Sequence, residues 1–241
     1  QLGDDYSVEM WIRNTLPNSS WPVTGYFFSR GTEQPATDHG DHFGISGTSG
    51  GQPGRLLFYN GATNKQSVRG ADVLKINQWY HVAMVRSGES VSLFLNGDLS
   101  KGASATAKPG YKSGVGTVFI GGRRDNFANF QGQLQEAALF DRSLTGDEIA
   151  AHFAASNVVD AAGETGRLVS HADYATAILK SKPIAYWPLR TDPLTVAQAS
   201  DASENSNHGD YEGRAGGVAL QTRWSRYTHA LLSSNEFLYI D

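Results

Sequence analysis

Strand-like stretches recur about every 8–15 residues over the first 142 positions, and no helical spacing interrupts them. In residues 6–12 every second side chain is apolar, and residues 79–86 give the strongest strand pattern. Asn96-Gly97 closes another stretch and supplies the positive φ values of a type I′ hairpin turn. Because strands joined by turns pair antiparallel, the sequence predicts an all-β fold, an antiparallel jelly-roll sandwich. The predicted strands are residues 6–12, 26–31, 42–45, 55–59, 79–86, 90–95, 117–122 and 133–140.

Two later stretches change to helical spacing. Residues 145–155 begin with Thr145, whose side chain can form a capping box with Glu148 three residues on. Residues 172–180 place Tyr174, Ile178 and Leu179 on one side, and Pro183 ends this helix. Residues 158–170 read as a linker. Strand character then returns at residues 184–189, 217–220 and 236–240.

Charge and composition exclude several classes of protein. The formal net charge is −4 and charged residues make up 18% of the chain, so we expect no nucleic-acid partner. No apolar run approaches the roughly 20 residues of a spanning helix, so we expect no membrane insertion of this fragment. The chain contains no cysteine, which excludes disulfides, thiol nucleophiles and cysteine-ligated zinc.

Five motifs occur in an order that points to a known family. They are Tyr6–Ile12, Trp79–Val85, Leu93–Gly97, Phe119–Gly122 and Phe130–Phe140, and Arg142–Thr145 and Glu148-Ile149 follow them. Together they resemble the laminin G-like modules of bacterial proteins, which belong to the concanavalin A-like lectin/glucanase superfamily. The resemblance covers residues 1–157. One departure is Gln135, which stands where the family commonly carries Asp and so removes a carboxylate from any metal site there.

The resemblance implies a concanavalin A-like jelly roll and a noncatalytic function. We expect a carbohydrate-binding or adhesion module of an exported multidomain protein, located outside the cell or in the periplasm or cell envelope. Its expected partners are glycans or envelope and matrix proteins. Two alternatives stay open: a structural spacer or protein-interaction repeat, and a glycoside hydrolase domain.

The C-terminal part resembles the opening of a second module. Residues 182–189 are similar to the first strand of such a module, and residues 201–211 to the turn that follows it. We therefore expect a fragment of a tandem array, with neighbouring repeats of the parent chain as partners. The expected parts are a body (1–157), a linker and short helix (158–183), and opening strands (184–241). Those strands would complete the sandwich in the same chain or by swapping, because a body without them exposes a sheet edge.

Candidate sugar-binding residues lie in two loops. Sugar binding needs an exposed aromatic ring with polar groups around it. Trp21 supplies such a ring, and the second loop mixes donors, acceptors and one aromatic side chain. The alternative interpretation is ordinary loop packing. The residues of the second loop are Arg123, Arg124, Asp125, Asn126, Phe127 and Asn129.

Two clusters carry side chains that can bind metals. Residues 201–211 offer hard oxygen ligands with a Gly that permits a tight turn, and calcium accepts such irregular sets. The alternative is an Asx-rich turn. Residues 38–42 combine two carboxylates with two imidazoles, and their alternative is a polar turn before a strand. The candidate calcium ligands are Asp201, Glu204, Asn205, Asn207 and Asp210.

Catalytic residues are not expected. A glycosidase needs two carboxylates about 5–10 Å apart at the scissile bond. Glu9 stands alone on its predicted strand, and Glu136 has glutamines, not carboxylates, at positions 133 and 135. The sequence therefore favours binding over hydrolysis.

Overall fold

The computed structural model describes residues 2–31, 40–61, 66–109, 117–123, 125, 127–156, 171–190 and 198–211. Its strands are β1 (Asp5–Asn14), β2 (Val23–Gly31), β3 (Gly40–Ser46), β4 (Arg55–Asn60), β5 (Gln66–Val73), β6 (Trp79–Ser87), β7 (Ser90–Leu95), β8 (Asp98–Thr106), β9 (Val118–Ile120), β10 (Gly132–Phe140), β11 (Ala185–Trp187), β12 (Gln198–Ala199) and β13 (Gly209–Asp210). Its helices are α1 (Gly146–Ala155) and α2 (His171–Lys180).

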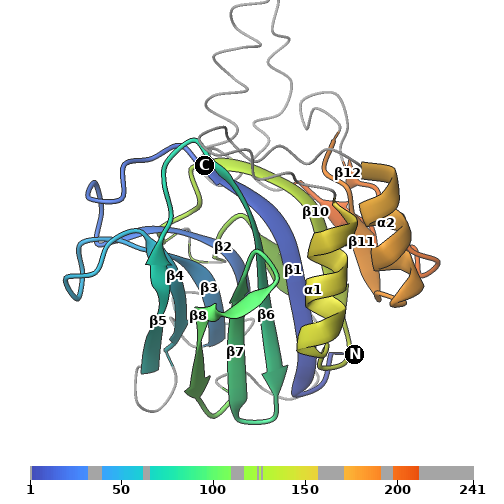
Figure 1. Cartoon of the computed structure of the whole chain (residues 1–241), viewed down its shortest axis with the longest axis horizontal. Helices are drawn as coiled ribbons and strands as arrows, with labels where there is room; N and C mark the ends of the chain where they lie inside the picture. The colour runs from blue at the N-terminus through green and yellow to red at the C-terminus, as the bar shows by residue number, and fades with distance from the viewer. Residues whose placement is uncertain are drawn as a thin grey trace, which may run out of the picture.

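The strands form two main antiparallel sheets, as the sequence predicts. One sheet has six strands in the order β11-β10-β1-β6-β7-β8, and the other has five in the order β5-β4-β3-β2-β9. Strands β12 and β13 pair separately. Figure 1 shows both helices on one side of the molecule, beside β1, β10 and β11, and strands β3, β4 and β5 on the other. The all-β sandwich prediction is therefore confirmed.

The core lies between the two sheets. Strand β1 sends its predicted apolar face, Tyr6 to Ile12 at every second position, into this core. The facing strands contribute Phe43 and Phe58, and Phe27 packs edge-on against Phe43 with ring centroids 4.6 Å apart. Burial of this many large apolar side chains is the main free-energy gain of the fold.

A second apolar layer lies on the other face of the six-stranded sheet. Trp11 points away from the main core and packs with Tyr174 and Ile178 of α2. Helix α1 begins with the predicted capping box, in which Thr145 and Glu148 bond each other's backbone N–H. The prediction that Leu179 shares the apolar side of α2 is wrong, because its side chain is 40% exposed. The helices thus cover this sheet face.

Strand β11 extends the six-stranded sheet at the edge of β10. Tyr186 is the register partner of Ala138, and Trp187 of Ala137. Trp187 packs into the main core, and its indole N–H donates to the Asn207 carbonyl oxygen at 2.8 Å. Both strands belong to the one chain of this structure, and completion in the same chain or by swapping stays a prediction. The linker at 158–170 and the predicted strands at 217–220 and 236–240 lie outside the described residues.

The turn after β7 has the predicted conformation, with φ of 52° at Asn96 and 76° at Gly97. Such left-handed angles suit Asn and Gly and match the twist of a hairpin. Among the described helices, none is long and apolar enough to cross a membrane.

The interpretation of residues 38–42 as a polar turn is wrong at Asp41, whereas the predicted strand that starts at His42 is confirmed. Asp41 and His42 lie within β3 and are buried. Asp41 accepts hydrogen bonds from Arg86, Tyr6 and Asn60, so its carboxylate is an ion-pair partner in the core. His42 bonds the Ser29 hydroxyl at 3.0 Å. Residues 38 and 39 lie outside the described residues.

Candidate functional site

Two rows of side chains cross the outer face of the five-stranded sheet. Phe43 and Phe58 are register partners that point into the core, so their neighbours in sequence point outward. Cross-strand register defines one outer row as Ser29, His42, Tyr59 and Ser67, and the next as Tyr26, Gly44, Leu57 and Arg69. In the described part of the chain, the helices pack on the other sheet, and the exposed or half-buried members of these rows are Tyr59, Ser67 and Arg69.

Loops at the end of this face turn it into a groove of about 470 Å³. Its volume falls within the range of about 300–1,000 Å³ that small-ligand sites occupy. On β3, Gly44 is needed for close strand pairing, since a Cβ there would lie 2.3 Å from the Gly25 carbonyl oxygen of β2. The groove is lined by Pro22, Val23, Tyr26, Ser46, Gly47, Ser49, Leu57, Tyr59, Ser67, Arg69, Arg123, Asp125 and Phe127.

Arg123 organises one wall of the groove. Its guanidinium binds both carboxylate oxygens of Asp125, at 3.0 and 2.5 Å, and is only 4% exposed. The same group lies 5.5 Å from the Tyr26 ring and 5.1 Å from the Phe127 ring. Asp125 also accepts from the Phe127 backbone N–H. The Phe127 ring is 49% exposed, so the wall is a fixed loop that presents an aromatic side chain to solvent.

Tyr26 lies beneath this wall as a neutral group. Burial raises the pKa of its phenol well above the ordinary value, although the charge of Arg123 acts in the opposite direction. The phenol therefore keeps its proton at neutral pH and can donate a hydrogen bond. Ser49 and Ser67 add neutral polar groups to the lining, whereas the Ser46 hydroxyl donates to the Gln52 carbonyl oxygen and accepts from the Arg55 backbone N–H. Such contacts around an aromatic ring can bind a polar, ring-shaped ligand.

The structure brings three of the seven predicted sugar-binding residues to this groove. Arg123, Asp125 and Phe127 line it. Asn129 is buried behind the loop, and its side-chain oxygen accepts a hydrogen bond from the backbone N–H of Arg123 at 3.4 Å. Trp21 is 54% exposed beside the rim, where the next residue, Pro22, is a lining residue. The predicted residues Arg124 and Asn126 lie outside the described residues.

The strand side chains of the groove were not among the predicted sugar-binding residues. Tyr59 of β4 lies opposite His42 of β3 in the register. Ser67 and Arg69 of β5 lie opposite residues of β4. Leu56 to Tyr59 form a continuous apolar run, so no alternation in the sequence indicates which of them face outward, and no pattern gives the cross-strand partners of Tyr59.

The candidate calcium ligands form a turn against β11. The carboxylate of Asp201 accepts backbone N–H bonds from Tyr186, Ser203 and Asn207, each at 2.8 Å. Burial raises the pKa of Asp201, but these hydrogen bonds outweigh burial and hold it below its usual range.

The other members of this set also have contacts within the chain, or face solvent. Asn205 and Asn207 donate to the Pro183 and Ile184 carbonyls, Asp210 accepts from Gln198, and Glu204 is exposed. In the part of the chain that the structure describes, no three acidic or histidine side chains are grouped to hold a metal. Calcium binding here stays a prediction.

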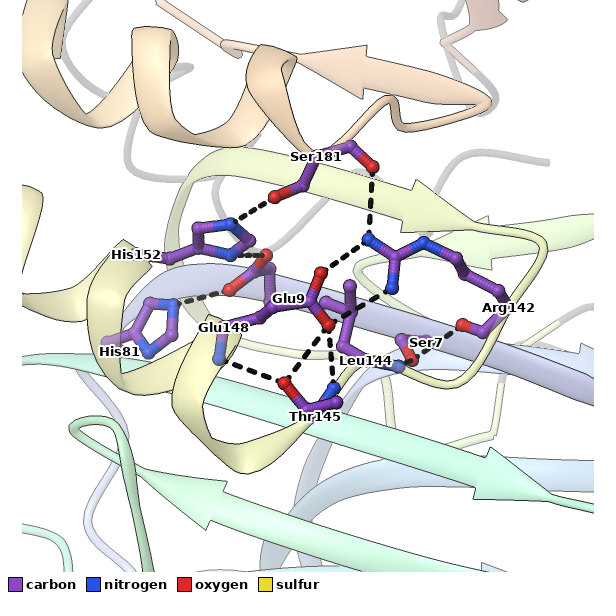
Figure 2. Close-up of polar contacts among 9 residues, drawn as sticks. All are labelled: Ser7, Glu9, His81, Arg142, Leu144, Thr145, Glu148, His152 and Ser181. Atoms are coloured by element: carbon purple, nitrogen blue, oxygen red, sulfur yellow. Dashed lines mark hydrogen bonds and ion pairs between the residues drawn. The ribbon is translucent and has the colours of Figure 1, made fainter.

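A buried polar network joins both helices to the six-stranded sheet (Figure 2). Glu9 accepts from His81 Nε2 at 3.0 Å and from His152 Nδ1 at 2.7 Å. His152 Nε2 in turn forms a hydrogen bond with the Ser181 hydroxyl at 2.8 Å. Burial would raise the pKa of Glu9, but the bonds from the two histidines outweigh it and lower that pKa. Glu9 is therefore an ionised carboxylate inside the protein.

The order Ser181, His152, Glu9 is that of a nucleophile, a base and an orienting carboxylate. Acyl transfer also needs N–H groups that face the reacting oxygen. The backbone N–H groups of Ser181 and Lys182 donate instead to Ile178 and Leu179 of α2, both at 3.0 Å. We therefore interpret the network as a structural tie between α1, α2 and the sheet.

A second buried carboxylate, Glu136, ties the C-terminal segment to the sheet. It lies at the β-bulge of β10 with φ of 56°. It accepts from His171 at 2.7 Å, from Arg190 at 2.8 Å and from the Tyr186 hydroxyl. Burial and the charge of Glu136 raise the pKa of Tyr186, which keeps that hydroxyl a donor. This carboxylate is thus occupied by structural contacts.

Glu148 gives an expected pH dependence at the start of α1. Hydrogen bonds from Arg142, and then from Thr145, lower the pKa of Glu148 from 4.5 to about 2 (Figure 2). A lowered pKa gives stability that is complete above pH 4.5 and lost as pH falls toward 2.

Glu148→Gln should therefore lower the melting temperature at pH 7 and leave it unchanged near pH 2. Because the pair is partly exposed, the effect should be at most about 1 kcal/mol. Exposed Glu89→Gln is the control in the same pH series of melting curves. A Glu148→Gln effect of equal size at pH 2 and pH 7 would contradict this assignment.

Comparisons with known proteins bear on this fold. The family model for laminin G domains described as "Concanavalin A-like lectin/glucanases superfamily" matches residues 1–150. No curated protein matches the chain in sequence.

Three solved structures illustrate the likeness in fold. A candidate carbohydrate-binding protein from Bacteroides ovatus is 16% identical, with a TM-score of 0.55, over 87% of this chain and 52% of its own. A pentraxin from Limulus polyphemus is 19% identical, with a TM-score of 0.47, over 70% of this chain and 76% of its own. The CBM40 module of the Ruminococcus gnavus IT-sialidase, bound to α2,3-sialyllactose, is 18% identical, with a TM-score of 0.47, over 62% of this chain and 83% of its own. The chain thus spans about half the length of the Bacteroides protein.

Proposed function

The chain belongs to the concanavalin A-like lectin/glucanases superfamily, and we propose that it is a noncatalytic carbohydrate-binding module of an exported protein. The ligand site of the proposal is the groove on the outer face of the five-stranded sheet. Its cell-envelope or extracellular location, and adhesion as its role there, are parts of the same proposal.

One observation carries the proposal: the groove combines an exposed aromatic ring with an ordered set of polar groups. The Phe127 ring is held beside the Arg123–Asp125 pair, and two exposed serines, Ser49 and Ser67, line the same groove. A sugar presents apolar C–H faces and a rim of hydroxyls, and this arrangement matches both. The Bacteroides protein that shares the fold is itself a candidate carbohydrate-binding protein, which supports the proposal of carbohydrate binding.

Hydrolysis is not the activity that this groove favours. Glycosidases place two carboxylates at the scissile bond. Asp125 is the one carboxylate among the described lining residues, and Arg123 binds both of its oxygens. The buried Glu9 and Glu136 belong to the networks around α1 and α2, on the other sheet.

A glycan array with the purified chain tests the proposal. We expect binding to a subset of glycans, and Phe127→Ala should weaken it about tenfold or more, as truncation of an aromatic binding residue does. Leu179→Ala is the control, because it removes a similarly exposed apolar side chain from α2. Trp21→Ala tests whether the site extends beyond the rim.

Two results would count against the site. If no glycan binds, the spacer or protein-interaction alternative takes its place. If glycans bind equally well to wild type and Phe127→Ala but not to Leu179→Ala, the chain binds sugar on the helical side instead.

A further inference from the structure

The groove carries an excess of positive charge. Its described lining contains two arginines and one aspartate. The charge of the aspartate, Asp125, is already balanced by Arg123. The Arg123 guanidinium donates a hydrogen bond to each oxygen of this carboxylate. Among the described residues no carboxylate forms an ion pair with the other arginine, Arg69, so its charge is available to a ligand.

The chain holds Arg69 in place through neutral groups alone. Its Nη2 donates to the Ser49 carbonyl oxygen at 3.0 Å. The neighbouring loop packs directly on the guanidinium, since a Cβ at Gly50 would lie 2.5 Å from Nη2. Gly50 has a φ of 79°, so the loop adopts a conformation that favours glycine. Its Nε is buried without a partner in the described part of the chain. Arg69 is therefore oriented before any ligand arrives.

Position along the sheet puts this charge next to the sugar-binding elements. Register places Arg69 opposite Leu57, and Ser67 opposite Tyr59, so Arg69 lies one pair along the outer face from the Tyr59 ring. Arg69 and Phe127 line the same groove. A ligand that lies against Phe127 can thus extend toward the guanidinium.

The geometry points to an acidic saccharide as the ligand, with a sugar carboxylate bound by Arg69. A guanidinium is planar and offers paired N–H donors that match a carboxylate, and this charge-assisted contact is stronger than a neutral hydrogen bond. A neutral sugar in the same groove would displace water from the guanidinium without supplying a negative charge to compensate for the lost hydration. This inference rests on the proposed function and names the substrate class of the same groove.

The test compares matched ligands. Calorimetry would measure the affinity of the wild-type chain for oligosaccharides that contain uronic or sialic acid, and for the same oligosaccharides after their carboxyl groups are reduced to alcohols. We expect the acidic form to bind at least tenfold more tightly, and the difference to shrink as salt is raised. Sulfated oligosaccharides form a third arm, because sulfate shares the charge but not the planar shape.

Variants assign that difference to Arg69. Arg69→Met should bind the acidic and the neutral form with equal affinity, so that the preference measured for the wild type is lost. Arg69→Lys keeps the charge without the paired donors and should recover only part of the preference. Arg13→Met is the control, because Arg13 is on β1 and bonds Gln133 and the Asn77 carbonyl oxygen, away from the groove.

The outcomes separate this inference from the proposed function. Equal binding of acidic and neutral forms, or a preference that survives Arg69→Met, would overturn the inference while carbohydrate binding stands. Tighter binding of sulfated than of carboxylated forms would also overturn the assignment of a carboxylate. If neither the acidic, the reduced nor the sulfated glycans of an array bind, both statements fail together.

Discussion

Asp41→Ala should destabilise the chain by about 3–5 kcal/mol, which is the cost of breaking a buried ion pair from one side. Asp41 on β3 and Arg86 on β6 join the two sheets through two contacts of 2.5 Å, and both side chains are fully buried. The Tyr6 hydroxyl and Asn60 amide donate to the same carboxylate. Without it, the Arg86 charge stays inside the core without the carboxylate that balances it.

Thermal unfolding at pH 7 would measure this effect as a fall of roughly 10 °C in melting temperature. Asp72→Ala removes an exposed aspartate from β5 and should change stability by no more than about 0.5 kcal/mol. Asp41→Asn keeps the shape and loses the charge, so it separates the ion pair from packing. If the melting temperature of Asp41→Ala lay within about 2 °C of that of the wild type, the pair would not hold the sheets together.

Trp187→Ala is the second change with a large expected effect, about 3–5 kcal/mol. Trp187 comes from the C-terminal segment, yet it packs in the core that β1 and β6 build. Its indole N–H also bonds Asn207, so the variant loosens the turn that Asp201 organises. The loss should therefore reach the whole domain, not only the edge strand β11.

Urea unfolding would show this as a lower midpoint of one cooperative transition. Trp21→Ala is a matched control, because it removes the same side chain from an exposed loop and should shift the midpoint little. If Trp187→Ala left the midpoint unchanged, residues 185–211 would not be part of the cooperative domain. That result would contradict the packing seen around β11.

Local sequence signals predicted the central strands and the helix starts well. The alternating face of β1, the Asn96-Gly97 turn and the Thr145 capping box each depend on residues within a few positions of one another. The edge strands β5 and β8 were missed, because both are polar and contain glycine. An edge strand bonds one neighbour and needs little apolar surface, so its sequence resembles that of a loop.

The candidate site was predictable only where it lies in one loop. Arg123, Asp125 and Phe127 are close in sequence, and their mixture of charge and aromatic ring indicated a binding loop. Tyr59 and Arg69 join them only through register across several strands, which no local pattern specifies. The partners of the buried acidic residues could not be predicted for the same reason. His152 is 143 positions from Glu9 in the sequence, yet the two form a hydrogen bond.

The central claim is that the outer face of the five-stranded sheet binds carbohydrate. An NMR titration of the isotope-labelled chain, with a glycan that the array identifies, tests it most directly because it reports where the ligand lies. We predict saturable shifts at the backbone signals of Tyr59, Ser67, Arg69 and Phe127, and none along α1 and α2. Saturable shifts confined to the helices, or to the turn from Asp201 to Asp210, would contradict the claim.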